Sequence, residues 1–209
     1  RIFNHCGLET RMVRSDSGAI GGSVSHEYMV LTRIAEGEQE SGENDVFYCD
    51  TCDYAANVER AESVLAESFE VSPYVATEIV DTPGAVSLEI MHRQFKMHPE
   101  LILKSLIYIA DEKTPVMALI RGDYDVEEVK LQNVVVANEI RMATAEEVDR
   151  LTGGSAKGFI GPIGLPENHG ITIVADASIQ NLKNFFVAVN HVDKHLVNAN
   201  WNVDLPLFA

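Results

Sequence analysis

The sequence predicts a mixed α/β protein in two parts, a β-rich segment followed by a mixed α/β domain. A chain of 209 residues is long enough for one or two domains with a sizeable core. The first 35 residues show strand patterns joined by a glycine turn. After residue 80, short apolar runs alternate with amphipathic segments, which favours strands interleaved with short helices.

In the first part, the elements expected in order are strands at residues 10–13 and 26–34, an acidic loop at 36–45, a strand at 46–48 and a helix at 54–68. The run from Gly18 to Gly22 fits neither the Walker loop nor the dinucleotide fingerprint. No lysine follows Gly21 or Gly22, and the spacing of the glycines is wrong for the fingerprint. The run therefore predicts a tight turn that lets the backbone approach another group closely.

The second part is expected to begin after residues 69–79, which predict a linker or strand. Asp81 or Thr82 suits a helix N-cap, with Pro83 at the first helical position. Thr144 and Glu147 predict a capping box. The helices are expected at 86–97, from 99 onward, at 126–135 and at 144–151. The strands are expected at 106–110, 116–120, 171–174, 185–189 and 195–201. Together these elements predict a mixed sheet or partial barrel for residues 80–209.

The charge and the cysteines limit the classes of protein. There are 16 basic and 32 acidic residues, a net charge of -16, and Arg60 is the only base between residues 36 and 90. Such a surface repels nucleic acid at long range, so any nucleic-acid contact should be local and supported by another part of a larger protein. The opening, without an initiator Met, predicts a piece of a longer polypeptide. No apolar run is long enough to span a bilayer, and three cysteines favour a reducing cytosol.

Cys49 and Cys52 form a Cys-x-x-Cys motif with three possible roles. A zinc site needs two more ligands at compatible spacing, and there is no second motif of this kind. A redox motif would favour a helix that begins at the first cysteine. A purely structural role is the third possibility, and we expect no metal here.

Lys104 interrupts an apolar run and has two interpretations. It is either a residue at a helix edge whose stem extends over an apolar surface, or a half-buried cation that faces an anion. His195 is close to His191, but four residues apart they share a face only in a helix, and this segment predicts a strand. We therefore expect no metal pair there.

A second glycine loop runs from Gly158 to Pro162. The backbone N–H groups of Phe159, Ile160 and Gly161 could converge on an oxygen as an oxyanion hole or anion nest. Pro162 has no N–H and stiffens the loop. A plain turn is the alternative.

Two motifs in the first part carry a family resemblance. The runs GAIGGSVSHE at 18–27 and DYAAN at 53–57, in this order, resemble the class II catalytic domain of bacterial-type prolyl-tRNA synthetases just after motif 2. The resemblance implies a partial class II antiparallel sheet for residues 1–78. It also implies that His26 and Glu27 lie near the prolyl site.

Residues 79–209 resemble the insertion, or editing, domain of the same enzymes, which is related to YbaK-like free-standing deacylases. The matching residues are Val80–Pro83, Leu103–Leu106, Leu119–Asp123 with Glu128–Lys130, Gly158–Pro162, Asp176, His195 and Asn200–Trp201. The resemblance implies post-transfer hydrolysis of misacylated Ala-tRNA(Pro). A pocket that fits proline cannot strongly reject the smaller alanine, so a second, size-selective site is needed.

The resemblance also assigns roles to residues. Lys104 would anchor the terminal adenosine, Gly161 and its loop would donate N–H groups to the oxyanion, and His195 would line the aminoacyl pocket. Asp176 would shape this pocket. The full set implied is Lys104, Gly161 and His195 as catalytic residues, with Gly158, Phe159, Ile160, Pro162, Asp176, Asn190, His26 and Glu27 as substrate-binding residues.

The same resemblance implies the remaining properties. Editing would need no metal or cofactor, whereas the full-length synthetase would use ATP and Mg²⁺. The partners would be the acceptor end of tRNA(Pro), the remaining synthetase domains and a second copy in a homodimer, in the cytoplasm and without a membrane. Motifs 1 and 3 and the motif 2 arginine loop do not occur here, so we do not expect this chain alone to activate proline. The alternatives are a catalytically silent insertion that acts as a scaffold, or a Cys-x-x-Cys metal or redox protein.

Overall fold

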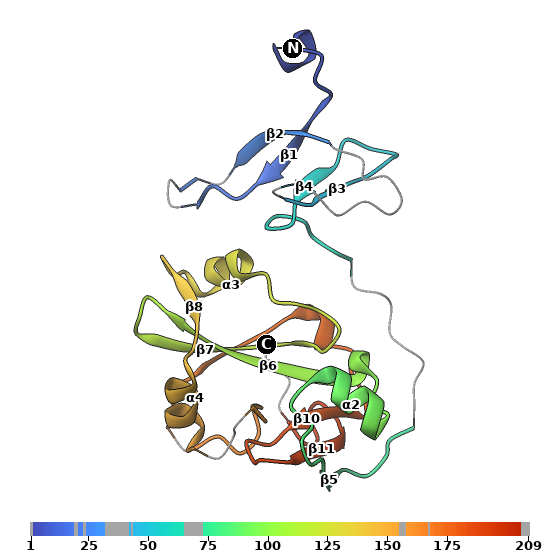
Figure 1. Cartoon of the computed structure of the whole chain (residues 1–209), viewed down its shortest axis with the longest axis vertical. Coiled ribbons are helices and arrows are strands. Elements are labelled where there is room, and N and C mark those ends of the chain that lie inside the picture. Colours follow the sequence, from blue (N-terminus) through green and yellow to red (C-terminus); the bar gives the residue numbers. More distant parts are fainter. Residues whose placement is uncertain are drawn as a thin grey trace. The chain divides into compact units, whose positions relative to one another are not determined.

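The chain forms two compact units, each with its own mixed β-sheet (Figure 1). The computed structural model describes residues 2–18, 21–22, 24–31, 42, 44–64, 73–154, 158–166 and 168–205. The first unit comprises residues 1–64 and 127–133, and the second comprises 65–126 and 134–209. The mixed α/β class is confirmed. The domain boundary at 78 and 79 stays a prediction.

The first unit is built on a four-stranded sheet with the order β2-β1-β4-β3. Its elements are α1 (Ile2–His5), β1 (Thr10–Ser15), β2 (Ser25–Val30), β3 (Val46–Tyr48) and β4 (Ala55–Asn57). The strands β1 and β2 are antiparallel, as are β3 and β4, whereas β1 and β4 run parallel. The predicted strands at 10–13 and 46–48 are thus confirmed, as is the part of the strand at 26–34 up to Val30. Residues 32–34 and most of the predicted acidic loop lie outside the described residues.

The predicted helix at 54–68 is wrong over its described part. Ala55, Ala56 and Asn57 form β4 and are all buried, because this strand lies between β1 and β3. The spacing of these alanines resembles one face of a helix. In the structure they are small residues on a strand that has a neighbouring strand on each side. Two N–H groups, of Arg60 and Ala61, then donate to the Asn57 carbonyl and form a turn. Residues 65–68 lie outside the described residues.

The second unit contains a seven-stranded sheet with the order β5-β11-β10-β6-β7-β9, and β8 also pairs with β6. The pairs β10–β6 and β7–β9 are parallel, and the other pairs are antiparallel. The strands are β5 (Glu78–Asp81), β6 (Ile102–Ala110), β7 (Thr114–Arg121), β8 (Ile140–Met142), β9 (Thr172–Ala175), β10 (Phe185–Ala188) and β11 (Lys194–Ala199). The strand β8 was not predicted, and β6 begins four residues earlier than expected.

The helical elements around this sheet are α2 (Leu88–Phe95), η2 (Pro99–Leu101), α3 (Glu128–Val135), α4 (Ala145–Thr152) and η3 (Ala177–Ile179). The helix α2 does not begin at Pro83. Ser87 is its N-cap and accepts from the Ile90 N–H. Residues 82–84 are held elsewhere, because the Thr82 N–H donates to the Asp193 carbonyl and the Gly84 N–H donates to the Asp193 carboxylate.

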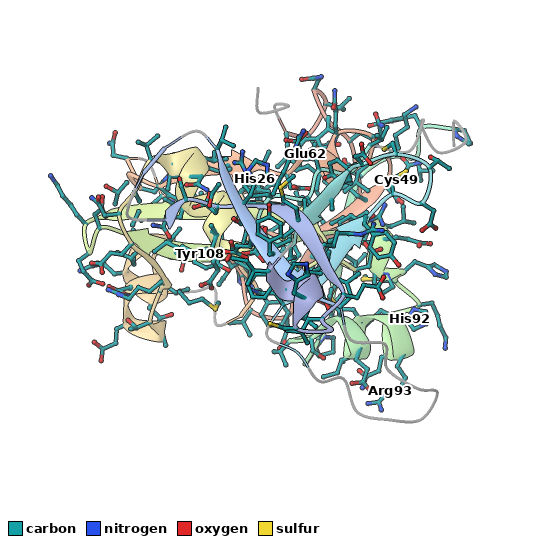
Figure 2. All side chains as sticks on the ribbon, turned by 90° about the horizontal axis from the view of Figure 1, so that it is seen from above. His26, Cys49, Glu62, His92, Arg93 and Tyr108 are labelled. Atoms are coloured by element: carbon teal, nitrogen blue, oxygen red, sulfur yellow. The ribbon has the colours of Figure 1, made fainter. Side chains whose placement is uncertain are left out.

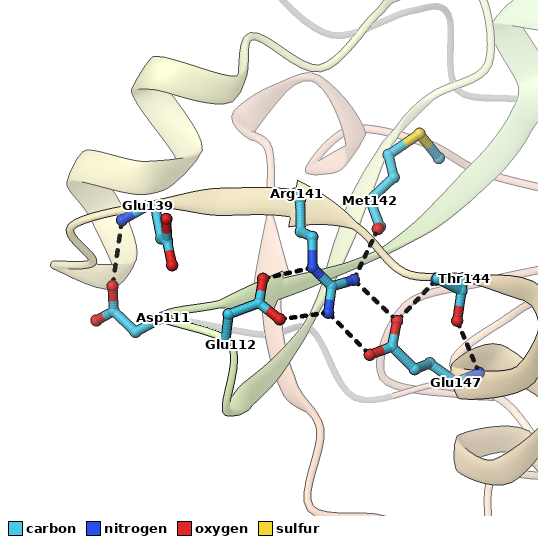
Figure 3. A network of polar contacts seen from close by, with 7 residues as sticks. All are labelled: Asp111, Glu112, Glu139, Arg141, Met142, Thr144 and Glu147. Carbon is cyan, nitrogen blue, oxygen red and sulfur yellow. Dashed lines mark hydrogen bonds and ion pairs between the residues drawn. The ribbon is translucent and has the colours of Figure 1, made fainter.

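The start of α4 follows the prediction and joins a charged network (Figure 3). Thr144 and Glu147 form the capping box, and Glu147 also accepts two hydrogen bonds of 2.9 Å from Arg141. Arg141 donates to Glu112 at the β6–β7 turn as well. One guanidinium on β8 therefore ties the tip of a hairpin to the first turn of a helix.

Two apolar clusters lie in the second unit. One contains Leu103, Ile107, Met117 and Leu119 from β6 and β7. The other contains Ala85, Met91, Met97, Ile102, Phe159 and Ala188, with Phe186 packed against it. Because successive side chains of a strand point to opposite faces, Ile102 and Leu103 place the two clusters on opposite faces of the sheet. The second cluster lies on the face that carries the predicted site residues.

Candidate functional site

Lys104 and His195 lie in one row across the sheet of the second unit, with Ala188 between them. His195 on β11 is the register partner of Ala188 on β10. The strands β10 and β6 are parallel with Val187 opposite Leu103, so the next residues, Ala188 and Lys104, are also neighbours. Two strand spacings separate the Cα atoms of Lys104 and His195 by roughly 10 Å. The sheet therefore brings together two residues 91 positions apart, from Lys104 to His195.

His195 is buried and neutral. Its side chain is 4% exposed, and burial lowers the pKa of its imidazole to about 4. The ring packs edge-on against Phe159, with centroids 5.5 Å apart. Its Nδ1 shares a hydrogen bond of 2.7 Å with the Thr82 hydroxyl. Within the described part of the chain, Nε2 makes no hydrogen bond, so this is the nitrogen that remains for a ligand.

Thr82 completes this arrangement but is not among the predicted site residues. It is fully buried directly after β5, where its N–H donates 2.7 Å to the Asp193 carbonyl. A threonine after Asp81 suggests a helix N-cap. That interpretation gives no indication that its hydroxyl contacts His195, far away in the sequence. The signal in the sequence is its place in the Val80–Pro83 motif.

Gly161 and its loop are bound to the end of β10 (Ala188). A Cβ built on Gly161 would overlap the Ala188 carbonyl oxygen and lie 2.7 Å from the carbonyl carbon, so only glycine allows this approach. The Asn190 side chain accepts from the Gly161 N–H at 3.1 Å and donates to the Gly161 and Ile163 carbonyls, each at 2.7 Å. The loop is thus a fixed part of the site.

These hydrogen bonds change how the predicted loop can act. The Gly161 N–H, one of the predicted donors, donates to the buried Asn190 side chain in this structure, and the predicted role of the loop stays a prediction. The Phe159 carbonyl is also engaged, by the Asn190 N–H at 3.0 Å. The N–H groups of Phe159 and Ile160 donate to no acceptor among the described residues. Gly158 and Pro162 flank them, so the donor pair that remains is Phe159 with Ile160.

Lys104 lies on a strand and not at a helix edge. Its side chain is 18% exposed, so the stem is packed while the ammonium group reaches the surface. The ammonium donates to the Tyr124 carbonyl and to the fully exposed Asp125 carboxylate, the latter at 3.1 Å. Its present partners are thus an oxygen dipole and an exposed anion, which an incoming phosphate could replace.

The turn that follows β7 presents these partners to Lys104. Arg121 binds Asp123 through two hydrogen bonds of 2.6 and 2.8 Å, and its guanidinium lies 4.1 Å from the Tyr124 ring centre. The hydrogen bonds between Arg121 and Asp123 raise the pKa of the arginine and lower the pKa of the aspartate. Gly122 donates to the Ile102 carbonyl, which fixes the turn against β6.

Asp176 caps a short helix. Its carboxylate accepts from the Ser178 N–H at 2.8 Å, and its own N–H donates to the Leu119 carbonyl. It is exposed, and no described contact joins it to Lys104, Gly161 or His195. Its predicted part in the aminoacyl pocket stays a prediction.

His26, labelled in Figure 2, and Glu27 belong to the first unit, on β2. Both side chains are exposed, and their register partners are Arg14 and Val13 on β1. Their predicted place near a prolyl site stays a prediction. Cys49 in the same unit is a free thiol, as are Cys6 and Cys52. Among the described residues, no group of three or more His, Cys, Asp or Glu could hold a metal ion.

Comparison with known proteins identifies a family and several relatives. The aminoacyl-tRNA editing domain family matches residues 82–205. The proline–tRNA ligase of Citrifermentans bemidjiense is 41% identical over 207 residues, which are 99% of this chain and 34% of that protein. The proline–tRNA ligase of Geobacter metallireducens is 43% identical over 200 residues, 96% of this chain and 33% of that protein. The chain thus spans about a third of the length of these relatives.

Two solved structures share the fold over more than half of this chain. One is a hypothetical protein with 20% identity and a TM-score of 0.51, covering 58% of this chain and 79% of that chain. The other is described as a candidate trans-editing enzyme for prolyl tRNA synthetase, with 22% identity and a TM-score of 0.50, covering 59% of this chain and 76% of that chain. No helix within the described residues has the length and apolar character to cross a membrane.

Proposed function

The chain belongs to the aminoacyl-tRNA editing domain family, and we propose that it hydrolyses the ester that joins a wrongly attached alanine to tRNA(Pro). The observation that carries this proposal is the row of Lys104, Ala188 and His195 on one sheet face. The loop at 158–162 is bound to the end of β10, beside this row. A cation, two backbone donors and a neutral imidazole therefore gather around a small residue.

Lys104 is proposed to anchor the terminal nucleotide. An ammonium group with a packed stem and an exposed head binds phosphate as a point charge. On binding, a phosphate oxygen would take the place of the exposed Asp125 carboxylate. That exchange costs little, because an exposed ion pair contributes little to stability.

The N–H groups of Phe159 and Ile160 are proposed to hold the developing oxyanion. Ester hydrolysis by water passes through a tetrahedral intermediate, and preorganised backbone donors stabilise its negative oxygen. Asn190 keeps these donors in position because it binds the loop on both sides of Gly161. A positioned water can attack without a strong nucleophile once this charge is stabilised.

His195 is proposed to orient the aminoacyl group through Nε2. Its Nδ1 is engaged by Thr82, and the lowered pKa keeps the ring uncharged at neutral pH. A neutral ring can donate or accept one hydrogen bond at Nε2, according to its tautomer. It contributes no positive charge that would repel the α-ammonium group of an amino acid.

Selection for alanine over proline is proposed to depend on size. Ala188 contributes only a methyl group between Lys104 and His195, and the Phe159 ring packs against His195. A site of this kind accepts an alanyl methyl and rejects a prolyl ring by steric overlap. The synthetic site for proline cannot make this distinction strongly, because alanine is smaller than proline.

The first unit is proposed to belong to a proline–tRNA ligase of which this chain is about a third by length. There, His26 and Glu27 would lie near the proline and adenylate site, with ATP and Mg²⁺ used by the whole enzyme. Its partners would be tRNA(Pro), the other synthetase domains and a second copy, in the cytoplasm. No step proposed for the editing unit depends on these groups.

The test is deacylation of Ala-tRNA(Pro), Pro-tRNA(Pro) and Cys-tRNA(Pro) by this chain. We expect the chain to release alanine from Ala-tRNA(Pro) selectively, in preference to proline and cysteine from the other two substrates. Lys104→Ala should abolish it, whereas Lys113→Ala, which removes an exposed lysine at the tip of the same hairpin, should not. Hydrolysis by the Lys104→Ala variant would refute the role of this residue. Absence of hydrolysis from all three substrates would instead favour a silent insertion that serves as a scaffold.

A further inference from the structure

The loop between β3 and β4 holds two free thiols that are three positions apart. Cys49 is half-exposed and Cys52 is exposed, and neither forms a disulfide (Cys49 is labelled in Figure 2). The Cys49 N–H donates 3.0 Å to the Tyr54 carbonyl, and Tyr48 is paired with Ala55. The hairpin therefore keeps both ends of the loop fixed while leaving its sulfur atoms open to solvent.

Two groups of Thr51 contact the Cys49 sulfur. The Thr51 hydroxyl lies 3.1 Å from it, and the Thr51 N–H donates to it at 3.4 Å. Cys52 lies three residues further along the same loop. Hydrogen bonds from Thr51, followed by those from Cys52, lower the pKa of the Cys49 thiol to about 7. A large share of Cys49 is therefore thiolate at neutral pH, and a second free thiol lies in the same loop.

We propose that Cys49 and Cys52 form a reversible redox pair that a neutral peroxide oxidises to a disulfide. The Cys49 thiolate attacks one oxygen of hydrogen peroxide, the O–O bond breaks, and Cys49 becomes a sulfenic acid while hydroxide leaves as water after protonation. The Cys52 thiol then attacks the sulfenic sulfur, forms the S–S bond and releases a second water. Two thiols and one peroxide thus give one disulfide and two waters.

The surroundings favour this chemistry over a metal site. Zinc needs four ligands, and no cluster of three or more ligating side chains occurs in the described part of the chain. Asp50 and Asp53 flank the thiols, and the whole chain carries a net charge of -16. An anionic oxidant is repelled by these charges, whereas hydrogen peroxide is not. The pair lies in the first unit and does not depend on the proposed editing activity.

The experiment treats the reduced 209-residue chain with equimolar hydrogen peroxide and measures its intact mass and its free thiols. We expect the mass to fall by two hydrogen atoms and the reactive thiols to fall from three to one. Peptide mapping should place the bond between Cys49 and Cys52, and dithiothreitol should reverse it. Cys6→Ser is the matched control and should leave this reaction unchanged.

Two variants test the assigned roles. Cys52→Ser should stop at the sulfenic acid, which dimedone traps on Cys49. Thr51→Val should slow alkylation of Cys49 by iodoacetamide several-fold at neutral pH, with the rate on Cys6 as the internal reference and circular dichroism as the check on folding. The proposal is overturned if peroxide leaves all three thiols titratable, if oxidation only links chains through Cys6, or if stoichiometric zinc occupies the thiols.

Discussion

Thr82 and His195 share a hydrogen bond of 2.7 Å between two buried side chains that are 113 positions apart. The threonine follows β5 and the histidine lies on β11, which pairs with β5. The hydroxyl fixes the orientation of the ring, and which nitrogen carries the proton depends on whether the hydroxyl donates or accepts. Thr82, which the sequence suggests as a helix N-cap and not as a site residue, thus influences what Nε2 can offer a substrate.

We expect Thr82→Val, which keeps the shape and removes the hydroxyl, to destabilise the fold by about 1–3 kcal/mol, because it leaves Nδ1 buried without a partner. Deacylation should fall as well, since the ring is no longer held in one tautomer. Urea unfolding gives the first quantity, and imidazole ¹⁵N shifts report the tautomer. Thr82→Ser keeps a hydroxyl and should retain the wild-type tautomer. An unchanged tautomer in Thr82→Val would show that Thr82 does not set it.

The stability of the second unit should depend on pH through His195. Its folded pKa of about 4 is below the unfolded value of 6.5, so the unfolded chain binds the proton more readily. The contribution is fully present above pH 6.5 and is lost as the pH falls towards 4. Over the whole range, this lowers the free energy of unfolding by about 3 kcal/mol. Between these pH values, the free energy of unfolding should change less steeply with pH in His195→Asn than in the wild type. Equal slopes would contradict the assignment of this pH dependence to His195.

The sequence predicts local features of the fold well. The capping box of Thr144 and Glu147 needs only four consecutive residues, so its prediction is confirmed. Strands with clear apolar runs, such as those that contain Val116 and Phe185, are confirmed for the same reason. The buried strand that begins at Ala55 is misread as a helix, because apolar spacing does not show whether a residue lies between two strands.

The site is less predictable because its geometry depends on register. Lys104 and His195 can be selected from the sequence, but only the pairing of β6, β10 and β11 shows that they share a row. The use of Asn190 to bind the loop, and the burial of Thr82, depend on contacts between segments far apart in the chain. No local pattern reports such contacts.

Gly161→Ala should displace the loop at residues 158–162. The added Cβ meets the Ala188 carbonyl, which belongs to a paired strand and cannot move freely. We expect the free energy of unfolding to fall by at least about 1–3 kcal/mol, because both Asn190 bonds to Gly161 are lost. Deacylation should be lost with it. Gly42→Ala is the matched control, since a Cβ there meets nothing within 4 Å. Wild-type activity in Gly161→Ala would mean that the loop position is not needed.

Arg141 should stabilise the hairpin tip and α4 through its two carboxylates (Figure 3). Arg141→Met should lower the melting temperature at neutral pH, because Glu112 and Glu147 lose their shared cation. The hydrogen bonds from Arg141 lower the pKa of Glu147 to about 2 from 4.5, so this contribution is present above pH 4.5 and is lost as the pH falls towards 2. The difference between the variant and the wild type should therefore shrink in acid and in high salt. Arg150→Met, at an exposed arginine of α4, should show neither effect. If Arg141→Met and Arg150→Met lower the melting temperature by the same amount at every pH, the effect of Arg141 comes from its charge alone and not from this network.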